Sequence, residues 1–243
     1  MPTAMHWDYA IILAFLAAVL PLMGKWRVES ILRRAGISQA ERLRLYASTI
    51  AFQWLLVALI FWRTTVHGLS LATLGLAIPQ PWLTGAVSIG LVALVLINQL
   101  VSLRFVGGRP EELHGKLAQV ALGIFPRDNM ERLVFAGVVV TVAICEELIY
   151  RGFIQTLFTG ISRSGFAGII ISAAMFSFAH LYQGRRGLIA TLIVGIVFSL
   201  TRFYTGSLVP SVAGHFVADL IAGYMLPGKL REALAIESAR SSA

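Results

Sequence analysis

The chain has 243 residues, of which 57% are hydrophobic and only 13% are charged. Because charged residues make up about a quarter of an ordinary globular sequence, this composition excludes a typical soluble domain and predicts a membrane protein. The formal net charge is +8. Its basic residues stand between hydrophobic runs, as in loops at an anionic membrane face, so we expect the bilayer and not a nucleic acid as partner. The single Cys145 excludes an intramolecular disulfide and a thiolate-rich metal site.

The hydrophobic runs predict an all-α fold, a polytopic membrane bundle of about seven transmembrane helices, with six to eight as the range. The clearest run, 82–103, has 22 residues and no charge, and about 20 residues cross a bilayer as a helix. In chain order, the predicted spans are 9–23, 46–62, 82–103, 134–158, 164–184, 187–201 and 203–228.

The connectors between these spans differ in charge. The connectors 25–44 and 104–132 carry six and five Lys or Arg residues, whereas 63–82 carries only Arg63. The positive-inside rule therefore predicts the amino terminus outside and the carboxyl terminus in the cytoplasm. We expect short surface helices within 25–44 and an interfacial helix within 112–125.

Prolines and glycines punctuate the polar connectors. Pro79 and Pro81 are expected to stop any helix in 63–82. Gly107, Gly108 and Pro110 are expected to end the helix of the third span. The predicted organisation is a three-helix membrane region with basic connectors over 1–132, a catalytic membrane core over 133–228 and a polar, frayed tail over 229–243.

Ionisable side chains well inside the predicted spans are confined to the last part of the chain. A charge near the centre of a membrane helix costs about 3 kcal/mol, and such residues usually face a bundle interior or a watery cavity. Six such groups in three spans are hard to explain by packing alone, so we predict a functional site. They are Glu146, Glu147, Arg151, His180, His215 and Asp219.

Helical spacing assigns different roles to the two adjacent glutamates. Glu147 and Arg151 are four residues apart and can pair along one helix face. Glu146 is offset by about 100° from Glu147, so Arg151 cannot neutralise both equally. One carboxylate is expected to be structural and the other free to act. In the same way Asp219 can orient His215, four residues before it.

Two kinds of chemistry fit these groups. In the first, Glu146 takes a proton from water and a histidine positions that water, while the remaining groups polarise a carbonyl. In the second, Glu146, His180 and His215 bind zinc and leave one position open for water. Spacing does not decide between them. A proton-coupled transporter and a non-catalytic membrane scaffold or immunity-type protein are the alternatives to an enzyme.

Three short motifs occur in order within the hydrophobic segments. They read EExxxR at 146–151, FxxxH from Phe176 to His180, and HxxxD from His215 to Asp219. With them the chain resembles the CPBP family of intramembrane proteases, the CAAX protease and bacteriocin-processing (Abi) group. The resemblance covers roughly residues 134–226.

The resemblance implies an intramembrane endopeptidase in a multi-pass protein, which we expect in the cell membrane. Its substrates would be prenylated CAAX-type or other membrane-associated peptides. Glu146 and His180 would activate water, and His215 with Asp219 would stabilise the oxyanion or complete a metal site. Arg151 would hold Glu147, and Phe176 would support the site. A zinc metalloprotease mechanism and a metal-free glutamate mechanism are both open. We slightly favour the metal-free one, because Arg151 is expected to pair with Glu147 and to leave Glu146 available as a base.

Overall fold

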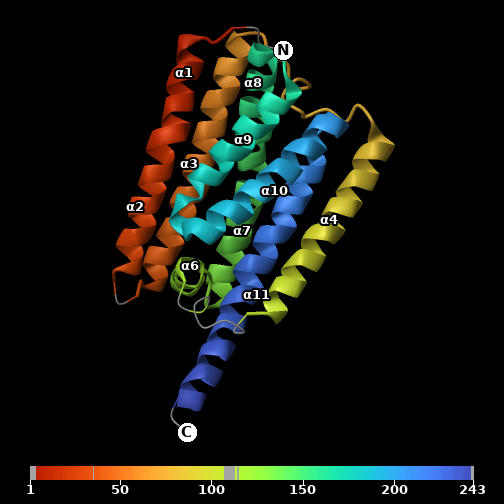
Figure 1. Cartoon of the computed structure of the whole chain (residues 1–243). Helices are drawn as coiled ribbons and strands as arrows, with labels where there is room; N and C mark the ends of the chain where they lie inside the picture. The colour runs from red at the N-terminus through yellow and green to blue at the C-terminus, as the bar shows by residue number, and fades with distance from the viewer. Residues whose placement is uncertain (1–3, 35, 107–112, 114, 242–243) are drawn as a thin grey trace.

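A computed structural model describes residues 4–34, 36–106, 113 and 115–241. Every regular element in this described part of the chain is helical, which confirms the all-α prediction. The long helices lie side by side in a bundle, with the amino terminus at one end and the carboxyl terminus beyond the other (Figure 1). The elements are α1 (Trp7–Ala14), η1 (Phe15–Val19), α2 (Leu20–Leu32), α3 (Gln39–Val66), α4 (Pro81–Arg104), α6 (Lys116–Ile124), α7 (Asn129–Glu147), η2 (Leu148–Ile154), α8 (Gln155–Ser162), α9 (Gly165–Ala179), η3 (Leu181–Gln183), α10 (Gly184–Thr205) and α11 (Val209–Ser241).

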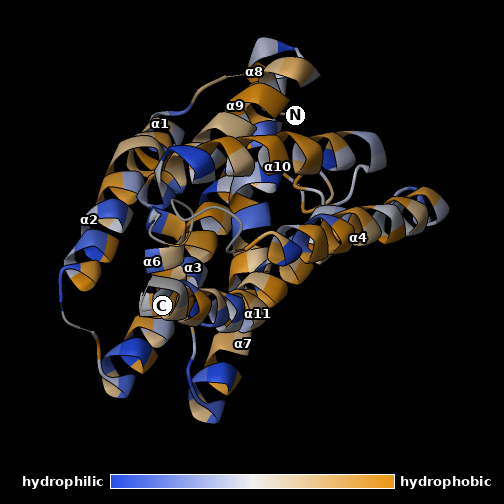
Figure 2. Cartoon of the chain, turned by 60° about the horizontal axis from the view of Figure 1, so that its bottom comes forward, coloured by the Kyte–Doolittle hydropathy of each residue, from blue (hydrophilic) through white to orange (hydrophobic). Residues whose placement is uncertain are grey.

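Six helical runs in the described ranges are long and apolar enough to cross a membrane, and the shorter α9 is also apolar. These seven agree with the predicted number, and the protein is an integral multi-pass membrane protein. The long runs are Trp7–Leu32, Gln39–Val66, Pro81–Arg104, Asn129–Ser162, Leu181–Thr205 and Val209–Ala239. Figure 2 shows hydrophobic residues over most of their length and hydrophilic ones toward the near ends of α2, α3 and α7.

The helices extend further into the basic connectors than the sequence indicated. The short surface helices expected within 25–44 are wrong as separate elements, because this stretch is shared by the end of α2 and the beginning of α3. Ser38 starts α3 with a capping box: its hydroxyl accepts from the Glu41 amide at 3.3 Å, and the Glu41 carboxylate accepts from the Ser38 amide at 2.8 Å. This reciprocal cap satisfies two amides that would otherwise lack partners.

Pro81 does not stop a helix as expected but stands in the first turn of α4. A proline is favourable there because the first amides of a helix have no intrahelical acceptor. The predicted breakers Gly107, Gly108 and Pro110 lie outside the described residues. The helix expected within 112–125 is α6, and its buried Ala121 belongs to a cluster with Leu230 of α11.

The carboxyl-terminal segment 229–243 is not frayed over its described part, because α11 continues past Pro227 to Ser241. The lower part of α11 projects beyond the bundle in Figure 1. Packing against α6 stabilises the first turns beyond the proline, where Leu230 is only 3% exposed. A polar sequence therefore continues the helix that the hydrophobic span begins.

Two helix pairs hold the elements that carry the polar residues. α3 packs along α7, where Arg42 and Glu131 form a buried ion pair at 2.8 Å and the rings of Tyr46 and Phe135 lie 5.4 Å apart. α9 packs against α10, and a Cβ added to Gly195 would stand 3.2 Å from the Cα of Ala173. The absence of a side chain at Gly195 therefore allows these two helices to approach closely.

Candidate active site

Glu146 and Glu147 lie near the middle of the continuous helical run Asn129–Ser162. Immediately after them the helix widens into the π-helical segment η2. The buried hydroxyl of Ser172, on α9, donates to the Tyr150 carbonyl within this segment at 2.8 Å. Wide turns of this kind occur often at functional sites, because they shift the side chains that follow them. Here the shifted side chains include Arg151.

Glu147 and Arg151 form the ion pair expected from their spacing. The Arg151 Nη1 donates to Glu147 Oε1 at 2.8 Å, and both side chains are fully buried. The Arg151 Nη2 also donates to the Gly195 carbonyl at 3.3 Å. The guanidinium lies 4.2 Å from the ring centre of Phe176. Arg151 is therefore enclosed by a carboxylate, a carbonyl and an aromatic face, in the interior of the bundle.

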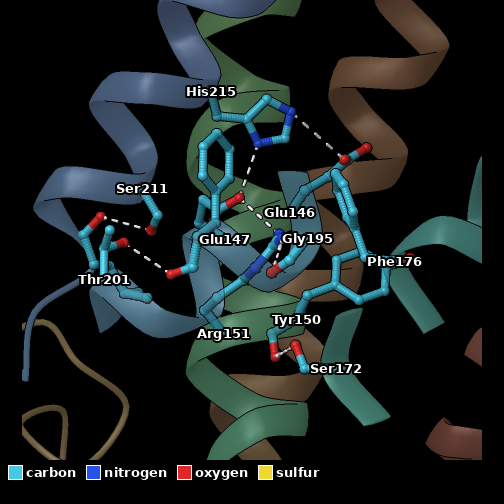
Figure 3. A network of polar contacts seen from close by, with 12 residues as sticks. Glu146, Glu147, Tyr150, Arg151, Ser172, Phe176, Gly195, Thr201, Ser211 and His215 are labelled. Atoms are coloured by element: carbon cyan, nitrogen blue, oxygen red, sulfur yellow. Dashed lines mark hydrogen bonds and ion pairs between the residues drawn. The ribbon is translucent and has the colours of Figure 1, made fainter. Parts of the chain in front are cut away.

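His215 is oriented by a different carboxylate from the expected one. Its Nδ1–H donates to Glu147 Oε1 at 2.9 Å, whereas its Nε2 is 3.6 Å from Asp219 Oδ2, beyond hydrogen-bonding distance. Glu147 comes from the neighbouring helix α7 and therefore ties α7, Arg151 and His215 together (Figure 3). Asp219 stays close enough to act on the imidazole by charge.

Glu146 has very different surroundings from Glu147. Its Oε1 accepts a hydrogen bond from the Gln53 Nε2 of α3 at 3.1 Å. Its Oε2 is buried and has no hydrogen-bond partner among the described residues. This oxygen lies 3.9 Å from the Nε2 of His215, as the dashed line in Figure 3 shows. One oxygen is held, and the other faces an imidazole across a gap that is too long for a direct hydrogen bond.

His180 stands at the end of α9, where its Nδ1–H donates to the Phe176 carbonyl at 2.8 Å. The ring of Phe176 lies 4.6 Å from that of His180 and 5.8 Å from that of His215. Phe176 therefore contacts both imidazoles as well as the Arg151 guanidinium. With the proton on Nδ1, a neutral His180 keeps the lone pair of Nε2 as an acceptor.

The side chains expected as possible zinc ligands are Glu146, His180 and His215. Among the described residues, no group of three His, Cys, Asp or Glu side chains is placed so that it could hold a metal ion. Glu146, His180 and His215 lie on three helices. The Nδ1 of each histidine donates to a protein oxygen and leaves Nε2 free, an arrangement that metal-binding histidines also use. Zinc binding at these residues therefore stays a prediction.

Three contributors to the site were missed by the sequence reasoning. Gln53 is the only amide in the predicted span 46–62, which was a usable signal. Gly195 accepts from Arg151 through its backbone carbonyl, and the Ser172 hydroxyl donates to a backbone carbonyl of η2. Contacts with the backbone of another helix leave no pattern in a sequence. The buried pair of Arg42 and Glu131 was also missed, because both residues were assigned to connectors.

Comparison with known proteins agrees with the motifs. Residues 128–221 match the family model described as type II CAAX prenyl endopeptidase Rce1-like. This segment contains all three motifs and excludes α1 to α6. A search of curated proteins found no match, and a search of solved structures found none either.

Proposed function

The chain belongs to the CPBP/CAAX protease family through residues 128–221, and on this premise we propose that it hydrolyses peptide bonds at membrane depth by a glutamate–histidine mechanism. Membership of this family supports an intramembrane endopeptidase. We assign a role to each site residue from the contacts of its side chain.

The observation that carries the proposal is the contrast between Glu146 and Glu147. Glu147 Oε1 binds Arg151 and His215, so its charge is compensated within the protein. Glu146 Oε1 accepts only from a neutral amide. The Oε2 atoms of both glutamates are buried without a hydrogen-bond partner among the described residues, so the two residues differ in the partners of Oε1. Since an unpaired buried acceptor is costly and Arg151 does not bind this carboxylate, Glu146 Oε2 is the position at which a water molecule would be bound and deprotonated.

In the proposed reaction, Glu146 takes a proton from water while the Nε2 lone pair of His180 orients that water. The water oxygen bonds to the scissile carbonyl carbon, and the carbonyl oxygen becomes negative. His215, held by Glu147 and protonated on both ring nitrogens, stabilises this oxyanion through its Nε2–H, with the Asp219 carboxylate beside the imidazolium. The carbon–nitrogen bond then breaks, and Glu146 returns the proton to the leaving amine. The hydrolysis creates no net charge and needs no oxidant.

We propose prenylated CAAX-type peptides, or other peptides anchored in the bilayer, as substrates, and the cell membrane as the location. The relevant feature is the apolar outer surface of the bundle, where Leu55, Ile89 and Ile193 are 58–74% exposed. A lipidated peptide can reach this surface from within the bilayer, whereas a soluble peptide would first lose its hydration.

The decisive experiment is cleavage of a farnesylated CAAX peptide by the purified full-length protein in lipid nanodiscs. Glu146→Gln and His180→Ala should each lower the rate at least about 10³-fold, the order expected when a reacting group is lost. Both variants should still insert and fold. Glu232→Gln, the same change on an exposed side chain, is the control and should cleave normally. Full activity of Glu146→Gln would contradict the proposal.

The same assay tests the metal-free form of the mechanism. Protein treated with a chelator and dialysed should retain its activity, because the roles proposed for Glu146, His180 and His215 require no metal ion. Elemental analysis before and after treatment provides the control. Stoichiometric zinc, with activity lost on stripping and restored by zinc alone, would show the metal-free choice to be wrong.

A further inference from the structure

Gln53 connects the amino-terminal half of the chain to the proposed base. It lies on α3, well outside the matched segment 128–221. Its Nε2 donates to Glu146 Oε1 at 3.1 Å, across 93 positions of sequence. Among the described residues, Gln53 is the hydrogen-bond donor to the Glu146 carboxylate.

The position of Gln53 is set by the packing of two long helices. Toward the start of α3, Arg42 Nε donates to Glu131 Oε1 of α7 at 2.8 Å, in a pair with 5% and 0% exposure. Next to Gln53, the Trp54 Nε1 donates to Thr141 Oγ1 of the same helix at 3.3 Å. These contacts fix the register of α3 against α7, so the amide is presented to Glu146 by rigid elements.

The chemical nature of Gln53 suits a residue that holds a base without neutralising it. Arg151 supplies Glu147 with a positive charge, whereas a carboxamide supplies Glu146 with a neutral donor. Glutamate is flexible, and fixing Oε1 directs Oε2 toward the space beside His215. The carboxylate thus keeps its negative charge and its free oxygen while losing its rotational freedom.

The orientation of the amide follows from the carboxylate, which in its ionised form can only accept hydrogen bonds. The NH₂ group of Gln53 must then face Glu146, and its carbonyl oxygen must face away. That oxygen, Oε1, is buried and has no partner among the described residues. It is therefore available to a water molecule or to a peptide N–H of a bound substrate.

From these contacts we infer that Gln53 is a positioning residue for the reaction, through which α3 completes a site whose other members lie within 128–221. The inference rests on the proposed function, since it requires Glu146 to act as the base. Gln53 itself need not touch the reacting atoms. Its effect is on the geometry of Glu146, and it should appear in the turnover rate more than in substrate binding.

The test compares kcat and KM for the farnesylated CAAX peptide in the full-length protein. Gln53→Met keeps the length of the side chain but removes the donor, and it should lower kcat about 10- to 100-fold with KM changed less than about threefold. Gln53→His returns an N–H donor at similar reach and should recover most of the loss. If Gln53→Met does not fold, Gln53→Asn, whose amide is too short to reach Glu146, should give the same loss of kcat.

Two matched controls separate positioning from general packing. Gln39→Met removes an exposed amide of α3 that donates to Asp128 Oδ2 at 2.8 Å, and Gln99→Met removes the amide that donates from α4 to the Ala218 carbonyl. Both should keep kcat within about twofold of the wild type. Equal losses in the controls, or a Gln53→Met variant with normal kcat, would overturn the inference while Glu146→Gln still tests the proposed function. An inactive wild-type protein would overturn the proposed function and the inference with it.

Discussion

At the scale of single residues, two adjacent glutamates on one helix differ because their neighbours differ. Glu147 Oε1 contacts Arg151 and His215, whereas Glu146 Oε1 accepts only from the neutral amide of Gln53. The spacing of Glu147 and Arg151 was enough to predict their pairing. The partner of His215 was expected to be Asp219 on the same helix, but the shorter contact is made by Glu147 from a neighbouring helix.

The enclosure of Arg151 gives a prediction about stability. Arg151→Ala leaves Glu147 as a buried carboxylate without its cation, which should cost about 3–5 kcal/mol of the free energy of unfolding. The expected result is a lower melting temperature in detergent and a lower yield, together with reduced cleavage.

Arg34→Ala is the control for this prediction, because Arg34 pairs with Glu41 on the surface, with its side chain 57% exposed. Exposed pairs contribute little to stability, so the melting temperature should hardly change. If Arg151→Ala instead lost activity at an unchanged melting temperature, Arg151 would belong to substrate binding.

At the scale of elements, the structure differs most clearly from the sequence prediction in the middle of the run Asn129–Ser162. The hydrophobic pattern predicted one regular helix over 134–158, yet seven residues of it form the π-helical segment η2. The wide turn is supported from outside by Ser172, which donates to the Tyr150 carbonyl. A local pattern cannot reveal this, because the supporting hydroxyl lies on α9 and depends on how α9 packs.

The ends of the helices show the opposite case. The sequence contained local signals for where these helices begin, but the signals were interpreted incorrectly. Ser38 and Glu41 form a recognisable capping box, and Pro81 is well suited to a first turn. Ser38 and Glu41 lay in a stretch assigned to a connector because of its charges, and Pro81 lay in one assigned to a loop because of its prolines. Helices at a membrane surface can carry charged first turns, so hydropathy alone placed these boundaries too close to the apolar centre.

At the scale of the whole molecule, the amino-terminal end of α1 lies beside the end of α3. The Asp8 carboxylate accepts from Arg63 Nε at 2.6 Å and lies 2.9 Å from His67 Nε2. The opposite end of the bundle carries the connectors rich in Lys and Arg and the projecting part of α11 (Figure 1). The two termini lie toward opposite ends of the bundle (Figure 1), and the distribution of basic residues predicts that the carboxyl-terminal end faces the cytoplasm.

This topology predicts which introduced cysteines react from outside the cell. In a Cys145→Ser background, a membrane-impermeant maleimide added to intact cells should label Ser70→Cys, in the connector after α3. It should label Arg231→Cys, on the projecting part of α11, only after the membrane is permeabilised. Both positions are exposed, whereas Cys145 is buried. The reverse labelling pattern would show that the basic end faces outward.

The sequence by itself determined the fold class, the approximate number of spans, the three motifs and the pairing of Glu147 with Arg151. Each of these depends on apolar length or on residues within one turn of the same helix, and such information is local. The tertiary structure alone decided that Glu147 also holds His215 and that Gln53 reaches Glu146. These contacts join residues on different helices, across 68 and 93 positions of sequence. Their distances are set by how the helices pack, and many arrangements of helices are compatible with one hydrophobic pattern.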